Sequence, residues 1–200
     1  MSATKLTYLA LPGLAEGIRY LLHYGGVQFE DERLTREEVA AMKEKLPLGQ
    51  VPVLQIEGKT LFQSQAICRF LAKRFDLTGK DEWDSVQCDI AADTIYEIRN
   101  AYLTFFHEKN EAAQKEKRVA AVKKIDFILG KLEGHLAKND GHFVKGQLTW
   151  PDFMIAAFSE HINSRTGRDM FAAKPLLSAL RDEINALPAI KAYIEKRPKY

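Results

Sequence analysis

A proline stands just before an expected strand, where the neighbouring backbone could serve a ligand. Val51 and Pro52 come directly before the strand-forming run 53–56. A proline within the ladder would remove a hydrogen-bond donor, so the pattern favours a cis Val51–Pro52 bond with the preceding backbone N–H and C=O turned outward. Such a backbone can pair with a bound peptide. A trans proline that simply enters the strand is the alternative.

A second set of polar groups stands at an expected helix start. Gln63 and Ser64 precede a run with apolar residues at helical spacing. Backbone N–H groups, a hydroxyl and the positive end of the helix dipole together favour a carboxylate or phosphate ligand. A serine that only caps the helix is the alternative interpretation.

Three acidic residues recur every fourth position further along the chain. Asp89, Asp93 and Glu97 would lie along one face of a helix, where a metal ion or an amine could bind. The two cysteines, Cys68 and Cys88, have neither redox-motif nor metal-ligand spacing, and we interpret both as structural thiols.

The secondary structure predicted for the chain changes from mixed strands and helices to helices alone near residue 80. Before that point the hydrophobic period changes repeatedly and predicts the order βαβαββα. Glu57, Gly58 and Lys59 form a turn signal between the last two strands, and Ser64 is expected to cap the following helix. The expected strands are 5–11, 28–34, 53–56 and 60–62, and the expected helices are 15–24, 36–45 and 64–78.

From residue 83 onward the pattern predicts one helix after another. Thr149, Pro151 and Asp152 have the types and spacing of a capping box with a proline in the first turn. We therefore expect two domains, a small α/β domain over residues 1–79 and an all-helical domain over residues 83–200. The expected helices of the second are 83–109, 112–137, 151–164, 176–186 and 188–196.

Composition excludes several classes of protein. The 200 residues are 46% hydrophobic and 28% charged, as in ordinary folded proteins. The 29 basic and 27 acidic residues leave a net charge of +2, too weak a bias to indicate a nucleic-acid or anionic-membrane partner. No apolar run approaches the roughly 20 residues of a membrane span, and the N-terminus does not look like a secretory signal. A cytoplasmic location is expected.

Several segments together resemble one family, the cytosolic glutathione transferases of the sigma class. Their order and separation match that family over nearly the whole chain. The resemblance implies an enzyme with a thioredoxin-like N-terminal domain and an all-α C-terminal domain, and it implies glutathione as co-substrate. The matching segments are 6–8 (Leu-Thr-Tyr), 13–19, 46–54, 63–67, 148–153 and 187–190.

The resemblance implies a role for Tyr8 as the catalytic residue. A thiol has an ordinary pKa of about 8.5, and its thiolate is the nucleophile. A tyrosine at the end of the first strand can donate its O–H to the sulfur and stabilise the anion. Without the resemblance, a tyrosine that only lines the core would be the plainer interpretation.

The remaining glutathione contacts are also implied by the resemblance. The main chain of Val51, before cis Pro52, would pair with the cysteinyl unit, and the γ-glutamyl carboxylate and the glycyl end would each have two side chains. An acid from the partner subunit of a homodimer would reach the γ-glutamyl ammonium. The residues concerned are Gln63 and Ser64 for the carboxylate, Lys43 and Gln50 for the glycyl end, and the partner's acid at the Glu97 position.

This sequence departs from the family pattern at four positions. Val39 replaces a tryptophan whose indole N–H helps to hold the glycyl carboxylate, and Leu14 replaces an arginine beside the thiolate. The branch that makes prostaglandin D2 carries an acid where Tyr96 stands and an aromatic residue where Thr104 stands. We therefore expect no metal and a different substrate fit from that branch.

The electrophile site is expected to be apolar. Its predicted lining is Gly13, Leu14, Tyr102, Phe105 and Tyr200. Packing of the helical bundle is the alternative role for the aromatic residues.

The resulting prediction is a glutathione transferase. It would add the glutathione thiolate to a small apolar electrophile or reduce an organic hydroperoxide. A glutathione-dependent prostaglandin isomerase and a weakly active structural relative, similar to the lens crystallins of this class, are the alternatives. Turnover of a generic electrophile separates the enzyme from the structural protein.

Overall fold

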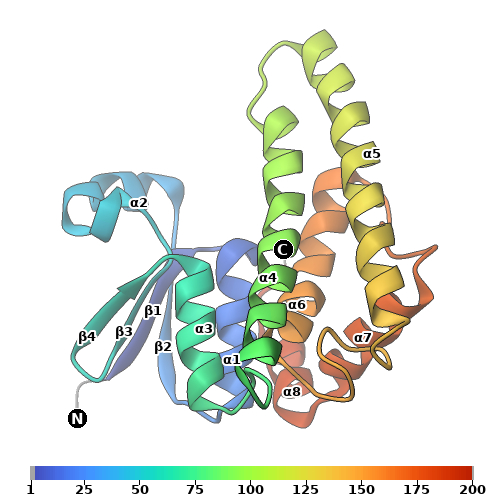
Figure 1. The fold of residues 1–200 in the computed structure, drawn as a ribbon. Helices are drawn as coiled ribbons and strands as arrows, with labels where there is room; N and C mark the ends of the chain where they lie inside the picture. Colours follow the sequence, from blue (N-terminus) through green and yellow to red (C-terminus); the bar gives the residue numbers. More distant parts are fainter. Residues whose placement is uncertain (1–2, 200) are drawn as a thin grey trace. The chain divides into compact units, whose positions relative to one another are not determined.

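The computed structural model describes residues 3–199 and divides into two compact units (Figure 1). The first comprises the chain up to Leu77 and from Ala186 onward, and the second is Thr78–Asn185. This division differs from the expected boundary because helix α8 (Pro188–Lys196) groups with the first unit. Tyr193 of α8 donates to Glu16 at 3.0 Å, and its ring stacks on His23 at 4.4 Å.

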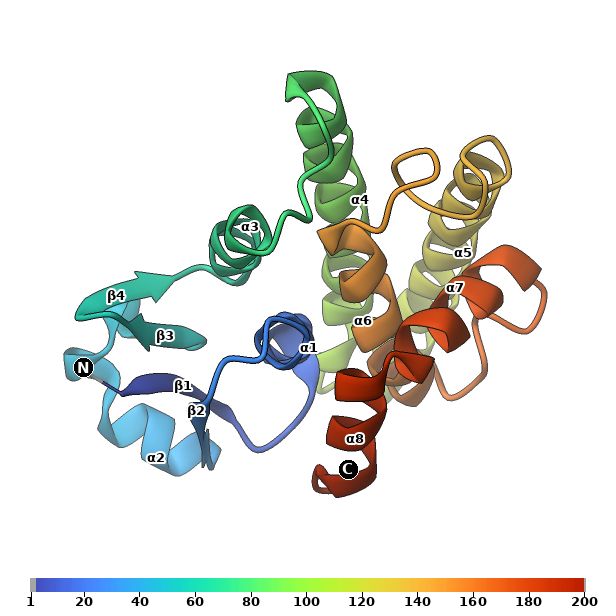
Figure 2. The ribbon, with the colours of Figure 1, turned by 90° about the horizontal axis from the view of Figure 1, so that it is seen from below.

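The first unit contains the predicted βαβαββα arrangement, a thioredoxin-like fold. Its four strands have the order β2-β1-β3-β4, with β1 parallel to β2 and antiparallel to β3. Figure 2 shows α1 and α3 on one face of the sheet and α2 on the other. The strands are β1 Thr4–Leu9, β2 Phe29–Leu34, β3 Val53–Ile56 and β4 Lys59–Phe62, and the helices are α1 Glu16–Tyr24, α2 Arg36–Ala41 and α3 Ser64–Arg74.

Local chemistry explains most boundaries of this unit. The β3–β4 turn has positive φ at both central residues, Glu57 (53°) and Gly58 (74°), as the tight turns of twisted hairpins require. The helix expected over 36–45 is divided, with α2 ending at Ala41 and a 3₁₀ turn at Lys43–Lys45. Helix α3 ends at Arg74, earlier than expected, and Asp76 with φ 56° takes the chain out of the helix.

The second unit is all helical, as predicted. Helix α4 packs against α5 and α6, and the apolar stripe of α5 is buried at Ile125, Leu129, Leu132 and Leu136. Its helices are α4 Glu82–Phe106, α5 Glu111–Leu136, α6 Trp150–Thr166 and α7 Pro175–Ala186.

The predicted capping box at the start of α6 is confirmed. The carboxylate of Asp152 is fully buried and accepts the backbone N–H of Thr149 at 2.7 Å, the Thr149 hydroxyl at 2.9 Å and the backbone N–H of Phe143 at 3.1 Å. These bonds satisfy donors that the helix start would leave unpaired, so the short polar segment stabilises a buried helix end.

Both cysteines lie in the core, and neither forms a disulfide. Burial raises the pKa of the Cys68 thiol and of the Cys88 thiol to about 12, so both stay protonated near neutral pH. A protonated, buried thiol is a poor nucleophile, which agrees with a structural role. Within residues 3–199, no helix combines the length and apolar character of a membrane span.

Candidate active site

Strand register brings three predicted segments to one edge of the sheet in the first unit. Thr7 of β1 pairs with Val53 of β3, and Val53 pairs with Phe62 of β4. One step further along each strand, the same edge carries Tyr8, Pro52 and Gln63. Segments separated by more than fifty residues in sequence therefore meet through two antiparallel pairings.

The Val51–Pro52 peptide bond is cis, as predicted. Pro52 is buried and Val51 is half-buried, and β3 begins only at Val53. The main chain of Val51 thus precedes the first ladder pair of β3 at this edge.

The start of α3 differs from the prediction in one respect. Gln63, not Ser64, is the N-cap residue, because Gln63 has φ 70° and ψ 109° and the helical conformation begins with Ser64. A left-handed φ at a residue other than glycine costs about 1–3 kcal/mol and is concentrated at ligand-binding positions. The Gln63 side chain is exposed and Ser64 is buried, at the positive end of an eleven-residue helix.

Tyr8 lies beside the loop that leads into the first helix. The backbone N–H of Leu14 donates to the Tyr8 hydroxyl at 3.0 Å. This bond uses an acceptor position of the phenol oxygen and not its proton. Gly13 has φ 45°, and a β-carbon there would lie 2.6 Å from the Tyr8 oxygen and 2.6 Å from Leu11. The close approach of loop and phenol therefore requires glycine at this position.

A buried arginine that the sequence analysis overlooked holds this loop in place. Arg19 of α1 is fully buried and donates to the carbonyl oxygen of Leu11 at 3.0 Å. It also pairs with Glu16 at 3.0 Å and Asp31 at 3.0 Å, and its guanidinium carbon lies 5.9 Å from the centre of the Tyr8 ring. Burial acts to lower the pKa of Arg19, but the two carboxylates outweigh it and the pKa is raised. The group is permanently cationic.

Two more arginines join this buried cluster. Arg33 pairs with Asp31 at 2.6 Å, and Arg197 pairs with Glu16 at 2.5 Å. With Arg19, three guanidinium groups contact the carboxylates of Glu16 and Asp31. One feature of the sequence could have predicted this cluster: Arg19 lies on the apolar face of α1, three residues after Glu16.

The two residues predicted for the glycyl end lie in the segment before β3. Lys43 and Gln50 are both exposed, and the Lys43 stem runs so close to Gly49 that a β-carbon there would lie 2.9 Å from it. The Lys43 side chain therefore lies next to the residue that precedes Gln50. Val39, in α2, is half-buried and offers no side-chain donor.

Tyr102 and Phe105, the predicted pocket residues of the second unit, contact different helices. Tyr102 contacts α6, where its hydroxyl bonds His161 at 3.0 Å, whereas the Phe105 ring lies 5.9 Å from the Arg118 guanidinium of α5. Both rings are buried. Glu97 is exposed and pairs with Lys124 at 3.3 Å. Tyr200 lies outside the described residues.

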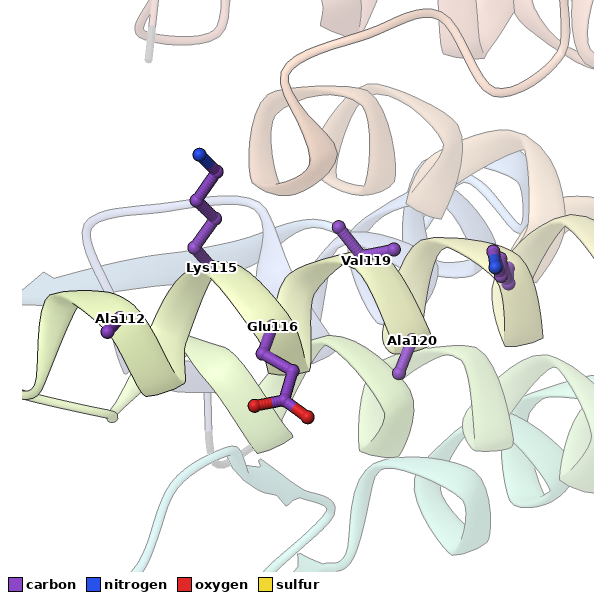
Figure 3. Close-up of a pocket in the computed structure, with 6 residues that line it drawn as sticks. Ala112, Lys115, Glu116, Val119 and Ala120 are labelled. Carbon is purple, nitrogen blue, oxygen red and sulfur yellow. The ribbon is translucent and has the colours of Figure 1, made fainter.

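A depression of about 510 Å³ lies on the exposed face of α5, and it contains none of the predicted site residues. In Figure 3, Lys115 and Val119 project to one side of the helix and Glu116 and Ala120 to the other. Its lining residues are Ala112, Lys115, Glu116, Val119, Ala120 and Lys123.

The basic residues around this depression are largely occupied. Lys117 pairs with Glu108 at 2.5 Å, Arg118 donates to the carbonyl of Thr166 at 2.6 Å, and Lys124 pairs with Glu97. The basic run of α5 is therefore mostly held in local contacts within this unit. Over residues 3–199, no group of three or more histidine, cysteine or acidic side chains is arranged to hold a metal ion.

Comparison with known proteins identifies the class. Residues 4–73 match the glutathione S-transferase N-terminal domain, and residues 96–197 match the glutathione S-transferase C-terminal domain. The chain belongs to the glutathione S-transferase family, whose members are transferases that use glutathione as co-substrate.

Individual relatives carry two kinds of name. The chain is 41% identical to glutathione S-transferase S1 of Drosophila melanogaster, over 96% of this chain and 78% of the relative. It is 33% identical to hematopoietic prostaglandin D synthase of Rattus norvegicus, over 98% and 96% of the two chains. A solved structure titled prostaglandin synthase D of Nilaparvata lugens superposes with a TM-score of 0.94, at 36% identity over 100% of both chains.

The Gly13 contact generates a prediction. Gly13→Ala should destabilise the protein by about 1–3 kcal/mol, because the new β-carbon meets Tyr8 and the backbone has a positive φ. Gly134→Ala is the control, since a β-carbon added to that glycine of α5 would meet no atom within 4 Å, and it should stabilise the helix slightly. Denaturant unfolding measures both, and wild-type stability in Gly13→Ala would contradict the close approach.

Proposed function

We propose that this chain is a sigma-class glutathione transferase in which Tyr8 stabilises the glutathione thiolate. The observation that carries the proposal is the Tyr8 loop: the phenol oxygen accepts the Leu14 N–H, and this bond orients the phenol so that its O–H can act as the donor to a ligand sulfur. Glutathione loses its thiol proton to water, and the O–H of Tyr8 then donates to the sulfur anion.

The bound thiolate attacks an electrophilic carbon. With an unsaturated ketone, sulfur bonds to the β-carbon, the π electrons move to the α-carbon and the resulting enolate takes a proton from water. With an organic hydroperoxide, sulfur attacks the peroxide oxygen, an alcohol leaves, and a second glutathione converts the sulfenic acid to the disulfide and water. In each case the protein supplies position and anion stabilisation.

The rest of the tripeptide follows the edge of the sheet. The backbone N–H and C=O of Val51 pair with the cysteinyl unit, and Gln63 with Ser64 binds the γ-glutamyl carboxylate at the α3 start. Lys43 and Gln50 bind the glycyl carboxylate. This assignment is supported by the shared edge of Tyr8, Pro52 and Gln63 and by the left-handed backbone of Gln63.

Each of the two expected domains contributes one part of the proposed site. Residues 1–79 bind glutathione, and residues 83–200 carry much of the electrophile site, including Tyr102 and Phe105. Gly13 and Leu14 contribute apolar surface beside the thiolate. Leu14 brings no charge, but the guanidinium of Arg19 contacts the same loop and lies 5.9 Å from the centre of the Tyr8 ring.

A glutathione-dependent prostaglandin isomerase is the second candidate. It is supported by the similarity to two proteins named prostaglandin D synthases. Tyr96 and Thr104 count against the same substrate fit, since Tyr96 accepts a bond from Arg99 and Thr104 donates to the Ala101 carbonyl. A panel of electrophiles, a hydroperoxide and a prostaglandin endoperoxide distinguishes the reactions.

The catalytic role of Tyr8 is tested by removing one oxygen. Tyr8→Phe should lower kcat for conjugation by a factor on the order of 10² or more while the fold and glutathione binding persist, because one donor to a developing anion is lost. Steady-state kinetics and calorimetric titration of glutathione measure the two properties. An unchanged kcat would remove Tyr8 from the mechanism.

We further propose a homodimer in which Glu97 reaches the γ-glutamyl ammonium in the partner's site. Helix α4 presents an exposed apolar stripe at helical spacing, with Trp83 70% exposed, Val86 40% and Ile90 53%. Exposure of such a stripe to water is energetically unfavourable, and a two-fold contact with a second copy of the chain would bury it. The acidic residues Asp89, Asp93 and Glu97 continue along the same helix.

Light scattering tests the dimer. The wild-type mass should be about 45 kDa, twice 22.7 kDa, and Ile90→Glu should shift the protein to the monomer and lower its activity. Ile90→Val, which keeps the apolar surface, is the matched control and should remain dimeric. A stable, fully active monomer of the wild-type chain would contradict both the dimer and the role of Glu97.

A further inference from the structure

Two arginines of the second unit lie against aromatic rings and have no acidic partner among the described residues. Arg99 lies on α4 and Arg165 on α6, and within residues 3–199 neither has a carboxylate within 4.0 Å. Arg99 donates to the Tyr96 hydroxyl at 3.2 Å, with its guanidinium carbon 5.3 Å from the centre of that ring. The guanidinium carbon of Arg165 lies 4.3 Å from the centre of the Phe106 ring. Both cations thus lie against aromatic rings instead of acids.

Arg165 contacts a buried polar pair. The Nε atom of Arg165 donates to Nε2 of His161 at 3.4 Å, and the hydroxyl of Tyr102 lies 3.0 Å from the same nitrogen. A guanidinium can only donate, so Nε2 of His161 accepts and Tyr102 is the second donor. The imidazole is therefore neutral and contributes no positive charge of its own.

Aromatic surface surrounds these groups, and we define the arginine–aromatic cluster by its six residues. Tyr102 and His161 are buried, whereas the other four members are half-buried and reach the surface of the unit. The Tyr102 ring meets the Phe106 ring nearly at right angles, at a distance of 6.5 Å. The members are Tyr96, Arg99, Tyr102, Phe106, His161 and Arg165.

The electrostatics of the cluster favour an anion. The pKa of His161 is lowered to about 4, first by burial and then by the charges of Arg165 and Arg99, so both guanidinium groups act on one ring. Glu97, two residues before Arg99, pairs with Lys124 of α5 and does not neutralise them. Two like charges beside a neutral histidine and apolar rings are stabilised by a bound negative charge.

We propose that the arginine–aromatic cluster binds the carboxylate of a lipophilic acid. Planar guanidinium groups match the two oxygens of a carboxylate, and the half-buried rings suit an apolar body more than a strongly hydrated ion such as phosphate. Since Tyr102 also belongs to the predicted electrophile site, the preferred electrophile carries a carboxylate away from its reactive carbon. This last step rests on the proposed transferase function, whereas carboxylate binding does not.

Calorimetric titration of decanoate into the whole protein without glutathione tests the binding step. Arg99→Gln and Arg165→Gln should each weaken decanoate binding about 10-fold or more, and the affinity for decanol should not change, because only the charged contact is lost. Arg181→Gln is the charge-matched control, because Arg181 has its own partner, Asp182, at 2.8 Å. Decanoate should also raise the pKa of His161, followed by NMR of the imidazole.

Two outcomes of the titration would overturn the site. Decanoate affinities that are equal in wild type and both variants would exclude a role for the two arginines. Inorganic phosphate that binds as tightly as decanoate, with the same loss in the variants, would show a general anion site without preference for a lipophilic acid.

Kinetics with an unsaturated ketone that carries a terminal carboxylate, and with its methyl ester, test the substrate class. Both arginine variants should lower kcat/KM for the acid about 10-fold or more and leave the ester unchanged. If the variants lower neither rate, the inference fails although conjugation stands. If neither compound reacts while decanoate binds through the two arginines, the proposed function fails and the carboxylate site stands.

Discussion

The buried guanidinium of Arg19 is the constraint on which the geometry of the first unit depends. It joins α1 to β2 through Asp31, to α8 through Glu16 and its partners, and to the loop before α1 through the carbonyl of Leu11. A buried charge of this kind must keep its partners, since removal of one partner from a buried pair typically costs about 3–5 kcal/mol. The network therefore specifies one position for the loop that carries Gly13 and Leu14.

The loop position decides what Tyr8 can do. Because Arg19 holds the Leu11 carbonyl, the next residues turn at Gly13 and present the Leu14 N–H to the phenol oxygen. The phenol is thus oriented by a backbone donor, and its O–H is the group that we expect to donate to a ligand sulfur. The strand register adds Pro52 and Gln63 at the same edge. The orientation of the Tyr8 phenol therefore follows from backbone pairing and one buried charge cluster.

Residue patterns predicted most elements of this chain because the relevant signals are local. Strand periods, the turn at Glu57 and Gly58 and the capping box of Asp152 each involve residues only a few positions apart. The N-cap of α3 was predicted one residue too late, at Ser64 instead of Gln63, because nothing in a glutamine side chain signals a φ of 70°. Arg19 was overlooked because a charged residue on an apolar helix face does not indicate which distant residues it contacts. Its partner Glu16 also bonds Tyr193, which lies 177 positions away in sequence. The partners of Tyr102 and Phe105 likewise could not be read from the sequence, since these residues lie three positions apart and contact different helices.

The proposed mechanism depends most directly on stabilisation of the glutathione thiolate by the phenol of Tyr8, and the pKa of the bound thiol measures that stabilisation. The ultraviolet absorbance of bound glutathione, titrated with pH in wild type and in Tyr8→Phe, gives the pKa of the sulfur directly. We expect a wild-type pKa about one unit or more below the ordinary 8.5 and a return towards 8.5 in the variant, at about 1.36 kcal/mol for each unit. Coincident titration curves for the two proteins would contradict this role of Tyr8.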